Sequence, residues 1–92
     1  MKLVNDKLGI DAELKENFTQ AEFEKYQNVL IEGTEGAKAE STISRMIVKA
    51  AVDSGILTGI DKNLEELPPR VVRWLTLKVR NFIDSETEVP QE

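Results

Sequence analysis

Two adjacent prolines, Pro68 and Pro69, stand directly before an amphipathic segment and fix where the last third of the chain becomes helical. Proline is tolerated in the first turn of a helix, because its fixed φ suits the helix and its missing N–H has no intrahelical partner there. Apolar residues then recur at helical spacing and form a predicted buried seam: Val71, Val72, Leu75, Val79, Phe82 and Ile83. The segment therefore predicts a helix with one face in a core and the other in solvent.

The outward side of this helix is basic, although the chain as a whole is acidic, with a net charge of −5. Residues 70–83 contain no acid and have a net charge of +4, whereas residues 84–92 contain four acids and no base. Tryptophan and arginine are strongly enriched among the residues that dominate binding interfaces. We therefore predict a partner-binding strip, the outward strip, that consists of Arg70, Arg73, Trp74, Leu77 and Arg80.

Trp74 has two interpretations, and its spacing leaves both open. It follows Arg70 by four positions and precedes Lys78 by four, so it lies away from the apolar seam. The indole either covers the edge of a small core or anchors an interface. The arginines, in the same way, either contact a partner, pair with acids of the chain or lie in solvent.

A second helix is marked by its start. The motif TQAE at residues 19–22 fits the capping box, in which the first and last side chains each bond the other residue's backbone N–H. Phe18 and Phe23 have the spacing of a hydrophobic staple around that cap. These signals predict a helix over about residues 20–32, with Gly33 as its C-terminal stop.

A third helix is predicted over about residues 38–54, before Gly55. Its apolar stripe consists of Ile43, Met46, Ile47, Ala50 and Ala51. Ser41 or Thr42 is an alternative N-cap, which leaves residues 37–40 extended.

These segments predict an all-α fold, a small bundle of three main helices in a single domain over residues 1–85. Residues 1–18 show no clear helical period, and we expect an irregular arm there that packs on the core. Residues 86–92 are expected to form a flexible acidic tail.

The composition argues against an enzyme and against a bound cofactor or metal. The chain has no cysteine and no histidine, so it has no thiol nucleophile or thiolate ligand, and it lacks the commonest general base near neutral pH and the commonest metal ligand. Asp61, Asn63 and Glu65 have the spacing of a calcium loop, but the next residue is not glycine and Val72 stands where the loop needs glutamate. We interpret these three polar residues as turns and helix caps.

Charge and hydropathy narrow the possible partners. A net negative chain is poorly suited to nucleic acid, since phosphate neutralisation needs an excess of Lys and Arg. No apolar run approaches the length that crosses a bilayer, and no apolar signal region follows Met1. We therefore expect a cytoplasmic protein that binds another protein, with neither a nucleic-acid nor a membrane partner.

Two segments also carry a family resemblance. ISRMIVKAAV at residues 43–52 and LPPRVVRWL at residues 67–75, in a small acidic chain, resemble small proteins of tailed bacteriophages and prophages. The chain looks most like the tail assembly chaperones, and the likeness covers about residues 40–90. The resemblance implies a non-catalytic protein of the host cytoplasm that coats the apolar helices of a tail tape measure protein. It also implies self-association.

Two other interpretations remain open. A small acidic protein can regulate or inhibit a host enzyme, with Asp and Glu in place of the phosphates that the enzyme normally binds. A chain of this size can also be a structural component of a virion. Both alternatives, like the first, require a protein partner.

Overall fold

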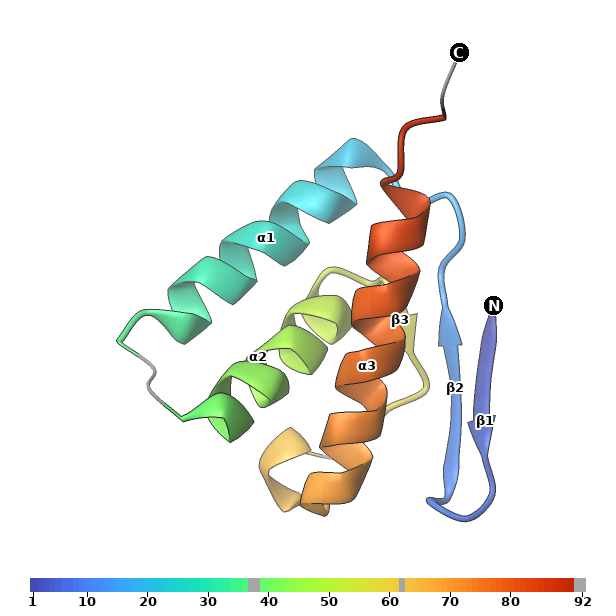
Figure 1. Ribbon diagram of the computed structural model, residues 1–92, viewed down its shortest axis with the longest axis vertical. Coiled ribbons are helices and arrows are strands. Elements are labelled where there is room, and N and C mark those ends of the chain that lie inside the picture. Colours follow the sequence, from blue (N-terminus) through green and yellow to red (C-terminus); the bar gives the residue numbers. More distant parts are fainter. Residues whose placement is uncertain (37–38, 62, 91–92) are drawn as a thin grey trace.

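The computed structural model describes residues 1–36, 39–61 and 63–90. Within them, the chain forms three α-helices, a short 3-10 helix and a three-stranded antiparallel sheet (Figure 1). In chain order the elements are β1 (Lys2–Asn5), β2 (Ile10–Leu14), α1 (Gln20–Thr34), α2 (Glu40–Asp53), β3 (Leu57–Thr58), η1 (Leu64–Glu66) and α3 (Pro69–Glu86). The fold is therefore α+β, and the prediction of an all-α three-helix bundle is wrong.

The correction concerns residues 1–18, where a β-hairpin replaces the predicted irregular arm. β1 and β2 pair antiparallel, with Leu3 opposite Ala12. Burial alternates along β2, so that Ile10, Ala12 and Leu14 face the core while the acids between them face solvent. This period of two is that of a half-buried strand. Alanine, aspartate and glutamate are weak strand formers, so the residue types conceal the pattern.

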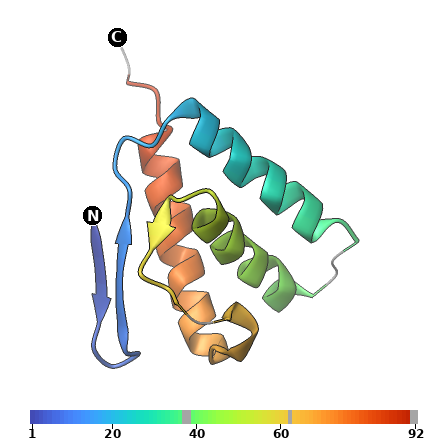
Figure 2. The ribbon, with the colours of Figure 1, turned by 180° about the vertical axis from the view of Figure 1, so that it is seen from behind.

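The sheet is completed by β3, which pairs with β2 and places Leu57 opposite Leu14. In both views of the molecule, the hairpin lies on one side of α3, and α2 and then α1 lie on the other (Figures 1 and 2). The most deeply buried large side chains come from the sheet, from the turn before β3, from α2 and from α3: Leu14, Ile56, Leu57, Val48, Leu75 and Val79. One core therefore joins the sheet to both of these helices.

The predicted capping box at the start of α1 is confirmed. The Thr19 hydroxyl accepts from the Glu22 N–H at 3.1 Å, and the Thr19 N–H donates to the Glu22 carboxylate at 2.9 Å. The rings of Phe18 and Phe23 lie 5.9 Å apart, centre to centre, as the staple requires. A hydrogen bond from Lys15, followed by the one from the Thr19 backbone, lowers the pKa of the Glu22 carboxyl.

The predicted stop at Gly33 is wrong, because α1 runs through this residue and ends at Thr34. A Cβ at position 33 would overlap the terminal methyl of Met46 on α2. Glycine at this position therefore leaves room for the Met46 side chain of α2, and it does not end the helix. The Thr34 hydroxyl donates to the Leu30 carbonyl at 2.7 Å in the last turn.

The other two helices follow the sequence more closely. α2 spans Glu40–Asp53 and begins without a side-chain cap, so neither Ser41 nor Thr42 is its N-cap. The part of the prediction that falls on residue 38 lies outside the described residues. α3 begins at Pro69, as the prolines predict, and extends to Glu86, the first residue of the predicted tail. Residues 88–90 have no regular structure, and the end of that predicted tail lies outside the described residues.

Two glycines with positive φ, substituted by alanine, allow a test of how closely the β3 segment must approach β2. Gly9 has φ +70° with open space where a Cβ would stand, whereas at Gly59, with φ +93°, a Cβ would lie 2.9 Å from the Asp11 carbonyl oxygen. We predict that Gly9→Ala costs about 1 kcal/mol from backbone strain alone. Gly59→Ala should cost about 3 kcal/mol, since it also pushes the β3 segment away from β2. Urea unfolding of both variants measures the difference, and equal losses would contradict it.

Candidate functional site

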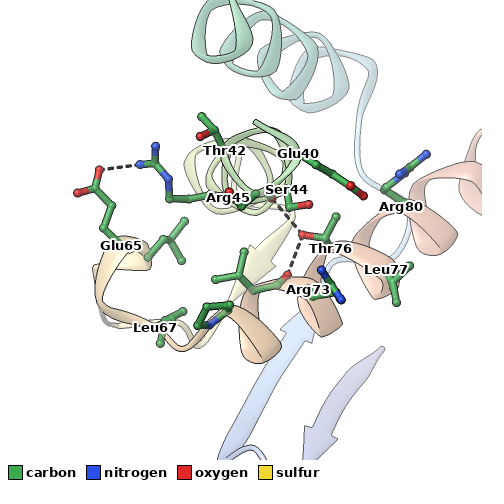
Figure 3. A pocket seen from close by; sticks show the side chains of 14 residues that line it. Glu40, Thr42, Ser44, Arg45, Glu65, Leu67, Arg73, Thr76, Leu77 and Arg80 are labelled. Carbon is green, nitrogen blue, oxygen red and sulfur yellow. Dashed lines mark hydrogen bonds and ion pairs between the residues drawn. The ribbon is translucent and has the colours of Figure 1, made fainter. Parts of the chain in front are cut away.

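A groove lies between the first turns of α2, the short helix η1 and α3 (Figure 3). Its volume is about 820 Å³, within the range of ligand sites. The lining is mixed: apolar side chains from η1, the segment after it and α3 alternate with hydroxyls from α2 and with charged groups from all three walls. A groove of this composition suits a partner that offers both apolar and charged groups.

The bottom of the groove is held by Thr76. This side chain is buried on α3, and its hydroxyl lies 2.7 Å from the Val72 carbonyl of its own helix and 3.0 Å from the Ser44 carbonyl of α2 (Figure 3). The single hydroxyl proton is shared between the two acceptors, as in other three-centre hydrogen bonds. The Thr76–Ser44 contact therefore fixes the distance between two of the three walls.

The η1 wall is held by the residues whose spacing resembles a calcium loop. The Asn63 side chain accepts from the Glu65 N–H at 3.1 Å and caps η1. The Glu65 carboxylate pairs with the Arg45 guanidinium of α2 at 2.6 Å (Figure 3). Asn63 thus has the capping role that the sequence predicts, whereas the Glu65 side chain forms an ion pair that it does not predict. The ion pair is partly exposed, so it contributes at most about 1 kcal/mol and mainly orients the wall.

The structure divides the predicted outward strip in two. Arg73, Leu77 and Arg80 line the groove, and we call these three residues the arginine rim. They share one strip of α3, because an α-helix repeats every 3.6 residues. Arg70 and Trp74 do not line the groove. The structure therefore places three of the five predicted residues in one wall of the groove and the other two outside it.

Trp74 lies on the other flank of α3, half-buried and packed against the core. The Lys78 ammonium lies 5.5 Å from the centre of its ring, at the distance of a cation–π contact. In this structure the indole therefore covers a core edge on the side of the helix away from the arginine rim.

The arginine rim is the part of the groove that offers unused binding groups. Leu77 is 54% exposed, and neither Arg73 nor Arg80 makes an ion pair with any of the described residues. Arg80 also lies near Tyr26 of α1. Burial raises the pKa of the Tyr26 phenol, while the positive charge of Arg80 partly opposes that rise.

Sequence patterns alone miss the remaining lining residues, which come from α2, η1, the segment after η1 and α3: Glu40, Ser41, Thr42, Ser44, Arg45, Leu64, Glu65, Leu67, Pro69, Val72 and Thr76. One local signal does exist for the groove floor. Thr76 is a polar residue at a position that its helical spacing places beside the buried seam, and such residues need a hydrogen-bond partner.

Comparisons with known proteins do not extend the resemblance seen in the sequence: no protein-family model matches the chain, and neither curated proteins nor solved structures give a match. Among the described residues, no helix combines the length and the apolar character needed to cross a membrane.

Thr76 gives a test of how the groove is held open. We predict that Thr76→Val, which keeps the shape and removes the hydroxyl, lowers the free energy of unfolding by about 1 kcal/mol. Thr42→Val is the matched control. Thr42 lines the same groove but makes no side-chain hydrogen bond to the described residues, so its loss should be near zero. Chemical denaturation compares the two, and a Thr76→Val protein as stable as the control would contradict the proposed role.

Proposed function

We propose that the protein is a non-catalytic assembly chaperone that holds an amphipathic segment of a partner protein in the groove between α2, η1 and α3. The observation that carries the proposal is the arginine rim, where two guanidinium groups without an ion-pair partner among the described residues flank an exposed leucine beside a preformed hollow. Arginine is enriched among the residues that dominate binding interfaces, which supports a protein partner at this rim.

The chemistry of the groove defines the segment it holds. Apolar side chains of the partner pack on Leu67, Val72 and Leu77, while its carboxylates meet Arg73 and Arg80. Arginine suits this task, because its planar guanidinium bonds a carboxylate through two N–H groups. The groove therefore favours an amphipathic helix with acids beside its apolar stripe, in the helix-in-groove mode of recognition.

The resemblance to tail assembly chaperones gives this partner a concrete form. The segments that carry the likeness fall in α2 and in the stretch that leads into α3, which are two walls of the groove. The proposed client is accordingly a tape measure protein, whose long apolar helices need covering in the host cytoplasm until the tail tube forms. An excess of negative charge elsewhere keeps such an assembly soluble.

The groove is tested with two labelled peptide helices that share one apolar stripe, one flanked by glutamates and the other by lysines. We expect the acidic peptide to bind more tightly in fluorescence anisotropy, with an affinity that falls as salt rises. Arg73→Glu and Arg80→Glu should each weaken binding about tenfold. Arg70→Glu is the matched control, since it makes the same charge change on the same helix outside the groove.

The possible outcomes distinguish two questions: whether the peptide binds in the groove, and whether a tape measure protein is the client. Equal losses for Arg70→Glu and Arg73→Glu would place binding outside the groove. Co-expression with the tape measure protein of the phage or prophage that encodes the chain tests the client itself, and soluble co-purification is expected. A tape measure protein that stays insoluble, beside normal peptide binding, would contradict the client and leave the groove assignment in place.

A further inference from the structure

The outer edge of the sheet, along β1, is a second surface that can form backbone hydrogen bonds with a partner. In the described part of the chain the strand order is β1-β2-β3, so β1 has a neighbour on one side alone. No described element lies beyond β1 in either view of the ribbon (Figures 1 and 2). An open strand edge presents backbone donors and acceptors to any strand that can align with it.

The hydrogen bonds of the hairpin show which backbone groups of β1 face outward. Met1 and Leu14 exchange two bonds: the Met1 amino group donates to the Leu14 carbonyl, and the Leu14 N–H donates to the Met1 carbonyl, both at 2.8 Å. In an antiparallel pair such bonded positions alternate along the strand. Leu3 and Asn5 therefore bond inward to β2, and the N–H and C=O groups of Val4 point outward.

The side chains around this edge carry opposite charges at equal distances along the chain from Val4. Val4 is an apolar residue of this edge and is 54% exposed. Two positions before it stands Lys2, the first residue of β1, and two positions after it stands Asp6, the first residue of the turn that follows β1; both are exposed. When a second copy of the strand is related to the first by a two-fold axis at Val4, Lys2 of each strand therefore lies opposite Asp6 of the other.

We infer that β1 pairs antiparallel with β1 of a second copy of the chain, with the two-fold axis at Val4. The two Val4 residues exchange their outward N–H and C=O groups, and their side chains meet on the solvent face of the sheet. Each Lys2 then lies opposite Asp6 of the second copy. On its other side Lys2 already faces Glu13 of β2, so the pairing gives each lysine an acid on both sides.

Other registers fit less well. A shift by one residue turns every side chain of one strand to the wrong face of the sheet. A shift by two places Lys2 opposite Val4 and loses both charge pairs. The association closes as a dimer, because β3 at the other edge is two residues long and offers no comparable strand. With so short a contact the dimer is weak and forms at high protein concentration.

The backbone bonds are tested by Val4→Pro. Proline is tolerated in an edge strand where its missing N–H faces outward, so the hairpin itself should survive. We expect this variant to remain monomeric in sedimentation equilibrium at concentrations where the wild-type chain and Val4→Thr dimerise. In wild type, the Val4 amide should become protected from hydrogen exchange as concentration rises, while the Leu3 amide, bonded within the hairpin, is protected throughout.

The register is tested by charge reversal. Lys2→Glu and Asp6→Lys should each weaken self-association about tenfold, because like charges then face each other twice. An equimolar mixture of the two variants should dimerise again, since in the mixed dimer every reversed position faces the opposite charge. Lys25→Glu on α1 is the control for net charge and should leave self-association unchanged.

Three results would overturn the inference: a chain that stays monomeric at all concentrations, a Val4→Pro variant that dimerises like wild type, or a mixture that fails to recover. Self-association without recovery in the mixture would place the interface elsewhere. The inference does not depend on the groove, so peptide binding by a strictly monomeric chain would refute the dimer alone. A dimer that ignores the acidic peptide would refute the proposed function alone.

Discussion

The burial of one face of α3 against two partners at once is the contact on which the rest of the structure depends. Leu75 and Val79 have no exposed surface, and they share their core with Leu14 of the hairpin and Val48 of α2. A chain of this length buries a modest share of its surface, so a single central helix must serve both sides. The hairpin is short, and isolated two-stranded ribbons are marginally stable in water. The hairpin is therefore stabilised by its packing against α3.

The position of α3 in the core also determines the geometry of the groove. Val72 and Thr76 follow the apolar seam toward α2, and the arginine rim comes next around the helix. A change in how deeply α3 sits in the core would therefore move the rim relative to α2 and η1. The Thr76 contact to Ser44 and the Arg45–Glu65 pair oppose such a shift from the two ends of the groove. Sites built on packed helices hold their geometry better than sites on loops.

The sequence predicts the elements that strong local signals mark. It misses the hairpin of residues 1–18, where weak strand formers conceal the period of two, and it misses the contacts between distant residues. The capping box of α1 and the proline start of α3 are signals within a few residues, and both are confirmed. The sheet instead needs Glu13 to meet Thr58 across 45 positions, and no local pattern records that pairing. Likewise, helical spacing brings Arg73, Leu77 and Arg80 onto one strip, whereas the walls opposite them exist through tertiary contacts alone. The spacing of Trp74 leaves open whether it covers the core or anchors an interface, and the structure packs it, half-buried, against the core.

The groove and the β1 edge share no residues, which allows the two proposed interactions to reinforce each other. The proposed two-fold dimer through β1 would contain two copies of the groove, one in each chain. A long helical client offers many similar amphipathic turns, so binding in the first groove raises the local concentration of client at the second. The gain can exceed the affinity of either groove by about a hundredfold without any new contact, provided that the client spans both.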